Sequence, residues 1–353
     1  MKKKYQNAFF IFGLAVLAIM ASQLDYAEVW ANIQRAGYWF FAVVGIWGLL
    51  YLFNTTAWWV IIKSQEDQPT PPPSPLTHHP SPITHHPSPI TPHLSFLWLY
   101  KITISGFALN YATPGGLMGG EPYRIMSLAP KIGTERATAS VLLYVMTHIF
   151  SHFWFWLLSC VLYLFIQPLN VPMGILLAIV ATFCLTAIWF FLKGYKRGIA
   201  VSGMKLLTHF PLLKRRARRF FDSHAEQLSN IDHQIAALHN QNPCTFVTAV
   251  GLELACRIVS SLEIYFCLLV LPDVSLGFLD CILILAFTSL FANMLFFIPL
   301  QLGGREGGFM MSASELGMTA SAGIFVALII RLRELIWTGI GLLLIKATGR
   351  KKN

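Results

Sequence analysis

The chain has 353 residues, of which 55% are hydrophobic and 12% are charged, and its formal net charge is +10 at pH 7. These proportions exclude an ordinary soluble domain and predict an all-α polytopic membrane protein. The basic residues flank apolar segments, so the positive charge indicates anionic membrane lipids as partners and argues against nucleic acid.

Apolar segments recur along the whole chain. They cover residues 8–24, 38–62, 96–113, 137–167, 172–192, 244–271, 279–300 and 320–345. Most are near the roughly 20 residues that a membrane-spanning helix needs, so we expect about six to eight transmembrane helices. The first segment follows three lysines and lacks a small-residue cleavage site, so we interpret it as a retained helix with a cytoplasmic N-terminus.

The stretches between these segments divide the chain into parts. They are the first two transmembrane helices (1–65), a Pro/His-rich insertion (66–95), a first hairpin with two transmembrane helices (96–192), a basic connector (193–243), a second half with another hairpin (244–348) and a basic tail (349–353). The insertion repeats Pro-Ser-Pro-x-Thr-His-His and cannot bury a core, so we expect a disordered cytoplasmic loop. The connector is either an interfacial amphipathic helix or a solvated cytoplasmic link.

A glycine-rich break at residues 110–124 separates two apolar runs. It carries Glu121 and Arg124, and its glycines are Gly115, Gly116, Gly119 and Gly120. A looser second version at residues 299–306 carries Gly303, Gly304, Arg305 and Glu306. Irregular backbone survives in a membrane only when it is buried in protein or lines a wet cavity. Two such breaks point to a transport site with glycine hinges; the alternative is two loops at the membrane surface.

The positive-inside rule decides how these breaks sit. If 96–113 crossed the membrane fully, nine basic residues within 193–219 would lie outside. We therefore predict two glycine-rich re-entrant hairpins, over 96–130 and 279–318, that enter from opposite sides. Opposed hairpins are what an inverted repeat produces, with their tips meeting near the midplane. Eight full crossings is the alternative topology. Both topologies place both termini in the cytoplasm.

Charged residues interrupt two of the later apolar segments. Glu253 and Arg257 are four apart, and Arg331 and Glu334 are three apart, so each pair is expected to share a helix face and neutralise itself. Glu263 has no evident partner. These charges either fix helix packing or line a cavity where arginine binds a phosphate. The substrate-binding candidates are Glu121, Arg124, Arg305, Glu306, Arg331, Arg333 and Glu334.

Two histidines, His148 and His152, are four apart and share a helix face. We interpret them first as core residues, then as a proton relay and last as a metal site. The sequence has no H-E-x-x-H, G-x-S-x-G or P-loop motif. We therefore expect no catalytic residue, no metal and no cofactor.

The two breaks, Thr113 to Arg124 and Pro299 to Gly307, resemble the paired signatures of the lysylphosphatidylglycerol synthase transmembrane-region family. The resemblance covers nearly the whole chain apart from 66–95. It implies a flippase-like module of the bacterial inner membrane that moves a lipid headgroup between leaflets. Full-length synthases carry a soluble C-terminal aminoacyltransferase domain, whereas this chain ends at Asn353 just after the last apolar segment, so we expect no synthetic activity.

The leading hypothesis is therefore a transporter of a phospholipid or polyprenyl-phosphate headgroup. One alternative is a membrane-embedded transferase that acts on a lipid-linked substrate, with Glu121 or Glu306 as general base. Another is a non-transporting partner that docks a soluble lipid-modifying enzyme through the basic connector. The sequence leaves a homo-oligomer open.

Overall fold

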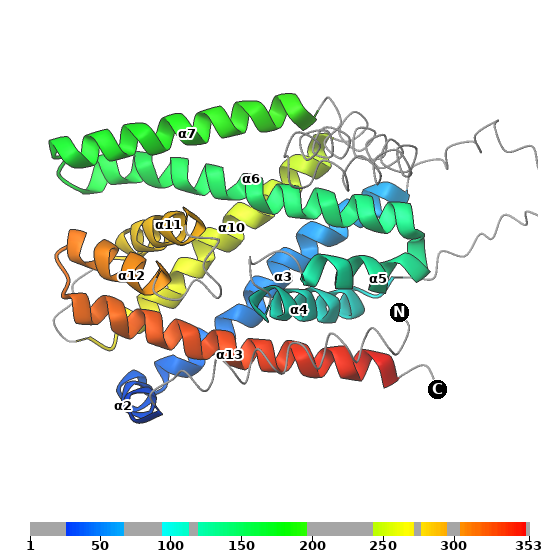
Figure 1. Cartoon of the computed structure of the whole chain (residues 1–353), viewed down its shortest axis with the longest axis horizontal. Helices are drawn as coiled ribbons and strands as arrows, with labels where there is room; N and C mark the ends of the chain where they lie inside the picture. Colours follow the sequence, from blue (N-terminus) through cyan, green and yellow to red (C-terminus); the bar gives the residue numbers. More distant parts are fainter. Residues whose placement is uncertain are drawn as a thin grey trace, which may run out of the picture.

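The computed structural model describes residues 26–66, 94–112, 119–195, 243–271, 277–294 and 304–350. All regular structure in these ranges is α-helical, as predicted (Figure 1). The helices are α2 (Tyr26–Ala36), α3 (Trp39–Glu66), α4 (Phe96–Ala112), α5 (Gly120–Ile132), α6 (Thr134–Ile166), α7 (Val171–Tyr195), α10 (Pro243–Leu268), α11 (Phe278–Met294), α12 (Gly304–Glu315) and α13 (Ala320–Arg350).

Four of these helices are long and apolar enough to cross a membrane: Trp39–Ser64, Thr134–Ile166, Val171–Leu192 and Cys244–Leu268. They are apolar all round, because one side meets protein and the other meets lipid. Helix α13 has 31 residues but carries charged side chains near its middle. The prediction of an all-α multi-pass membrane protein is confirmed.

The long helices form a bundle in which α3 and α10 pack along each other. Helix α6 packs against both, and α13 packs mainly along α4 and α12 (Figure 1). Helix α7 covers α6 at the edge of the bundle and exposes large apolar side chains such as Ile179 and Phe190, as a lipid-facing helix does.

Two pairs of shorter helices, α4 with α5 and α11 with α12, enter the bundle from opposite ends (Figure 1). Helices α5 and α12 have 13 and 12 residues. At 1.5 Å per residue each is about 20 Å long, which is short of the roughly 30 Å hydrocarbon core. Neither spans alone, which supports the proposal that the two pairs are opposed re-entrant hairpins.

Glycines bring these helices into close contact. A Cβ on Gly120 would lie 2.2 Å from the carbonyl oxygen of Gly106, and one on Gly341 would lie 2.4 Å from the Cβ of Ala108. In contrast, the backbone of Gly119 (φ −98°, ψ −40°) is one that any residue adopts. Between α5 and α6, Gly133 has φ +88°, which glycine adopts easily. The described hairpin glycines therefore serve close approach more than unusual turns.

Several predicted features lie outside the described residues. They are the first apolar segment (8–24), the Pro/His repeat, nearly all of the basic connector, the end of the tail, and Gly115, Gly116 and Gly303.

Candidate functional site

Buried charged and polar side chains gather in two groups. The central polar chain connects α3, α4, α5, α6 and α10 and consists of Asn54, Asn110, Glu121, Arg124, Tyr144, His148, Glu253 and Arg257. The α13 ion cluster connects α10, α12 and α13 and consists of Glu263, Arg305, Glu306, Arg331, Arg333 and Glu334.

The central polar chain begins where α4 ends and α5 starts. Asn110 Nδ2 donates to Glu121 Oε1 at 2.9 Å, while Asn110 Oδ1 accepts from the backbone N–H of Gly120 at 2.7 Å. Arg124 Nη1 lies 3.4 Å from the same Glu121 oxygen. Asn110 thus caps the first turn of α5 and holds the carboxylate that faces Arg124.

Apart from its contact with Glu121, Arg124 is enclosed by aromatic rings. Its guanidinium carbon lies 4.7 Å from the ring centroid of Phe107, 5.2 Å from that of Tyr144 and 5.8 Å from that of Trp58. The side chain is 1% exposed. Among the described residues, Arg124 Nε and Nη2 and Glu121 Oε2 are buried without a hydrogen-bond partner. The site therefore holds a cation and a carboxylate whose hydrogen-bonding capacity is only partly used.

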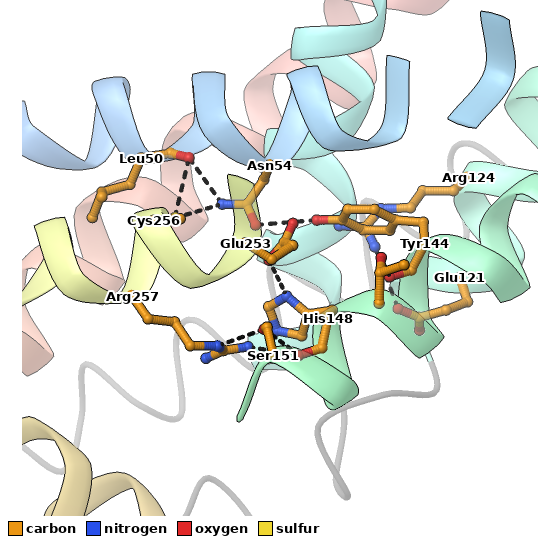
Figure 2. Close-up of polar contacts among 11 residues, drawn as sticks. Leu50, Asn54, Glu121, Arg124, Tyr144, His148, Ser151, Glu253, Cys256 and Arg257 are labelled. Atoms are coloured by element: carbon orange, nitrogen blue, oxygen red, sulfur yellow. Dashed lines mark hydrogen bonds and ion pairs between the residues drawn. The ribbon is translucent and has the colours of Figure 1, made fainter. Parts of the chain in front are cut away.

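Tyr144 joins this end of the chain to α3. Its hydroxyl donates to Asn54 Oδ1 at 3.2 Å, and Asn54 Nδ2 donates to the Leu50 carbonyl at 2.9 Å and to Cys256 Sγ at 3.4 Å (Figure 2). These contacts connect α6, α3 and α10 at one level of the bundle.

The other end of the chain is a histidine and carboxylate pair between α6 and α10. His148 Nδ1 lies 2.7 Å from Glu253 Oε2. Arg257 Nε donates to Ser151 Oγ at 2.8 Å, and its Nη2 donates to the His148 carbonyl at 2.9 Å (Figure 2). Glu253 and Arg257 interact electrostatically along α10, as their spacing suggested, but the hydrogen bonds of both side chains go to α6.

The α13 ion cluster centres on Arg333, which is 2% exposed. Its Nε and Nη2 donate to the two Glu263 oxygens at 2.6 and 2.9 Å, the bidentate geometry that arginine favours. The guanidinium also lies 3.8 Å from the ring centroid of Trp47. Glu263, which had no evident partner in the sequence, is therefore paired across helices.

The remaining pairs of the cluster fasten α12 to α13. Arg305 pairs with Glu334, and Arg331 pairs with Glu306. The predicted pairing of Arg331 with Glu334 along α13 is wrong, because each side chain binds an opposite charge at the start of α12. A charged turn of α12 faces the charged turn of α13, so pairing between helices leaves all four groups compensated.

The two groups approach each other at the end of α4. Tyr111 lies within electrostatic range of Arg305, Arg333 and Glu334. The last turn of α4 thus lies within electrostatic range of the first turn of α12 and of the charged turn of α13.

The sequence identified the charged residues of both groups but not their supports. Gly106 was not singled out, yet its Cβ position lies 2.4 Å from Arg124 Nε. Asn54 and Asn110 were also missed as members of the site, and they resemble ordinary polar residues in apolar segments. The proline and glycine signal that marked the break at 110–124 was the best pointer to Asn110.

Among the described residues, no three histidine, cysteine, aspartate or glutamate side chains gather as a metal site requires. The model for the lysylphosphatidylglycerol synthase TM region matches residues 8–341. No curated protein and no solved structure matches the chain.

Proposed function

Because the chain belongs to the lysylphosphatidylglycerol synthase TM region family, we propose that it is a lipid translocase that moves a phosphate-bearing headgroup across the membrane. The family consists of membrane modules in lipid modification or translocation. The proposed lipid is a phospholipid or a polyprenyl phosphate, and the proposed location is the bacterial inner membrane with both termini in the cytoplasm.

The observation that carries this proposal is the open hydrogen-bonding capacity of Arg124. Two of its N–H-bearing nitrogens are buried without a partner among the described residues. An unpaired buried polar group costs about 1–3 kcal/mol, and more when it is charged. A phosphate oxygen pair would satisfy both nitrogens in the bidentate geometry that guanidinium groups favour.

Glu121 gives the site a second recognition element. Its Oε1 accepts from Asn110 and contacts Arg124, while its buried Oε2 has no partner among the described residues. An ammonium group would satisfy this oxygen. A headgroup with both a phosphate and an amine therefore fits the pair of Arg124 and Glu121 better than a headgroup with phosphate alone.

The α13 ion cluster contributes differently, because its arginines already bind carboxylates. We propose that Arg305 and Arg331 contact the lipid only after their pairs with Glu334 and Glu306 separate. Separation of these pairs would release α12 from α13 and open the bundle on the side of the second hairpin. The glycines at the two breaks would provide the hinges for this rearrangement.

Headgroup accessibility in proteoliposomes tests the proposal. Fluorescent phosphatidylglycerol, aminoacylated phosphatidylglycerol and a polyprenyl phosphate would be compared for quenching by a reagent confined to the outside. We expect the purified chain to accelerate exchange of at least one of them. We expect Arg124→Gln to abolish this exchange, and Glu121→Gln to reduce it for the aminoacylated lipid more than for phosphatidylglycerol.

Arg136→Gln is the matched control, because Arg136 lies in the first turn of α6 outside both polar groups. It should leave exchange unchanged. The proposed site would be overturned if the protein accelerated the exchange of none of these lipids. It would also be overturned if folded Arg124→Gln and folded wild type exchanged lipid at equal rates.

The second candidate is a membrane-embedded transferase, which the open Oε2 atom of Glu121 favours as a general base. This candidate predicts a covalently modified lipid product when a soluble donor is added. Mass spectrometry of the lipids recovered from the same proteoliposomes would distinguish it, since translocation leaves their masses unchanged.

A further inference from the structure

We propose that the pair of His148 and Glu253 binds and releases one proton in each cycle, and that lipid movement is thereby coupled to a proton gradient. This inference rests on the proposed translocation and adds its energy source. A hydronium ion on one side would transfer its proton to the free nitrogen of the neutral His148 ring, so that one O–H bond breaks, one N–H bond forms and water is left. On release, the N–H bond breaks and water on the other side accepts the proton, which restores the neutral ring.

The geometry of the pair suits a proton that is exchanged with the surroundings. Nδ1 of His148 faces Glu253 Oε2 at 2.7 Å, which leaves Nε2 as the ring nitrogen that can accept a proton. The His148 side chain is 27% exposed, whereas that of Glu253 is 1% exposed. In the proposal the less buried partner, His148, receives the proton, and the buried carboxylate compensates the imidazolium charge. Glu253 Oε1 is also buried without a partner among the described residues, so the carboxylate has spare accepting capacity.

Charges of both signs act on His148 from the helices around it. Glu253 on α10 contacts the ring nitrogen, Arg257 on α10 donates to the His148 carbonyl, and Arg124 on α5 lies against Tyr144 and Phe107, which both approach the His148 ring. On α6 itself, the His152 ring lies 5.5 Å away and the Tyr144 ring 6.3 Å away, centroid to centroid. The pair thus lies between one compensating carboxylate and two opposing guanidinium groups, so a change at either arginine alters proton binding.

The proton site and the proposed phosphate site share two aromatic side chains. Phe107 lies 4.7 Å from the Arg124 guanidinium and 6.1 Å from the His148 ring. Tyr144 lies 5.2 Å from the same guanidinium and also approaches His148. A phosphate on Arg124 would neutralise a cation that opposes the imidazolium. Lipid binding is therefore expected to raise the affinity of His148 for a proton, and protonation is expected to raise the affinity for lipid by the same factor.

The test uses the full chain in proteoliposomes, with the membrane potential held at zero by potassium and an ionophore. With one proton per lipid, a gradient of one pH unit should change the ratio of labelled lipid between leaflets by about tenfold. In His148→Gln this response should disappear while slow exchange without a gradient persists. A pH-sensitive dye inside the vesicles should report proton entry with lipid movement in the wild type but not in His148→Gln.

His152→Gln is the matched control, with the same substitution one turn away on the same helix and no acidic partner in the described residues. It should keep the gradient response. Infrared difference titration in detergent gives a readout that does not need transport. The chain has eleven histidines, so we expect one component of the imidazole signal to be missing in His148→Gln and retained in His152→Gln.

The outcomes separate the two proposals. Exchange that ignores the pH gradient in the wild type would overturn proton coupling and leave translocation standing. An absence of exchange under every condition would remove translocation and the coupling together. Titration signals that are the same in wild type and His148→Gln would overturn His148 as the proton site.

Discussion

Arg333 and Arg124 are both almost fully buried arginines, but their surroundings differ. Two nitrogens of Arg333 donate hydrogen bonds to the two oxygens of Glu263. The cluster around this pair contains three arginines and three glutamates. Arg124 reaches one glutamate oxygen at 3.4 Å and otherwise faces aromatic rings. A compensated charge holds helices together, whereas an undercompensated one is available to a ligand. We therefore propose that the α13 ion cluster mainly stabilises the resting structure and that the central polar chain recognises the lipid first.

The largest effect on stability is expected from breaking the bidentate pair. Glu263→Met leaves Arg333 without its main partner, and loss of one member of a buried pair costs about 3–5 kcal/mol. The free energy of unfolding in detergent, followed by circular dichroism, would measure it. The double variant Glu263→Met with Arg333→Met should recover most of the loss. Glu135→Met, at an exposed site on α6, should change little; equal effects at 263 and 135 would contradict the assignment.

A smaller loss is expected where the first hairpin is closed by glycine. Gly120→Ala places a methyl group 2.2 Å from the Gly106 carbonyl oxygen, and such overpacking costs about 1–3 kcal/mol. Gly251→Ala is the comparison, because nothing lies within 4 Å of its added Cβ. Alanine favours a helix by about 1 kcal/mol over glycine, so this variant should be slightly more stable. We therefore expect the two substitutions to change the free energy of unfolding in opposite directions.

A single hydrogen bond of the central polar chain should matter less. Tyr144→Phe removes the bond to Asn54 but keeps the ring beside Arg124. The expected loss of unfolding free energy is about 0.5–1.5 kcal/mol. Lipid exchange should continue, because the aromatic enclosure is intact. Tyr38→Phe, at an exposed position, provides the control, and a complete loss of exchange in Tyr144→Phe would show that the hydroxyl itself takes part.

The smallest stability effect, with a large effect on transport, is expected at Arg124. Arg124→Lys keeps the charge and a contact with the rings, so the free energy of unfolding should change by about 0.5 kcal/mol. Lysine lacks the planar fork, so exchange of a phosphate-bearing lipid should fall by about tenfold or more. Arg136→Lys should leave both measurements unchanged. A destabilisation as large as that of Glu263→Met would show that Arg124 is a structural group like Arg333.

Much of the fold follows from patterns that the sequence displays directly. The apolar segments 38–62, 137–167, 172–192 and 244–271 correspond to α3, α6, α7 and α10. The boundary between the hairpin at 96–130 and the apolar segment 137–167 corresponds to the separation of α5 from α6 at Gly133. Helix α2 was not predicted, because it is a short polar stretch next to strong apolar signals. In the site, the sequence showed which charges were present. It could not show their partners, since spacing along one helix suggested Arg331 with Glu334 while the facing turn of α12 supplied Arg305 and Glu306.

The contact between Gly106 and Arg124 links the variation of two positions that lie on different helices. Any side chain at position 106 would begin 2.4 Å from Arg124 Nε and displace the guanidinium. Among related chains, those with a larger residue at 106 should therefore carry a shorter residue at 124, and those with arginine at 124 should carry glycine at 106. Correlated substitution at these positions would trace, across species, which relatives have kept the cation in its aromatic enclosure.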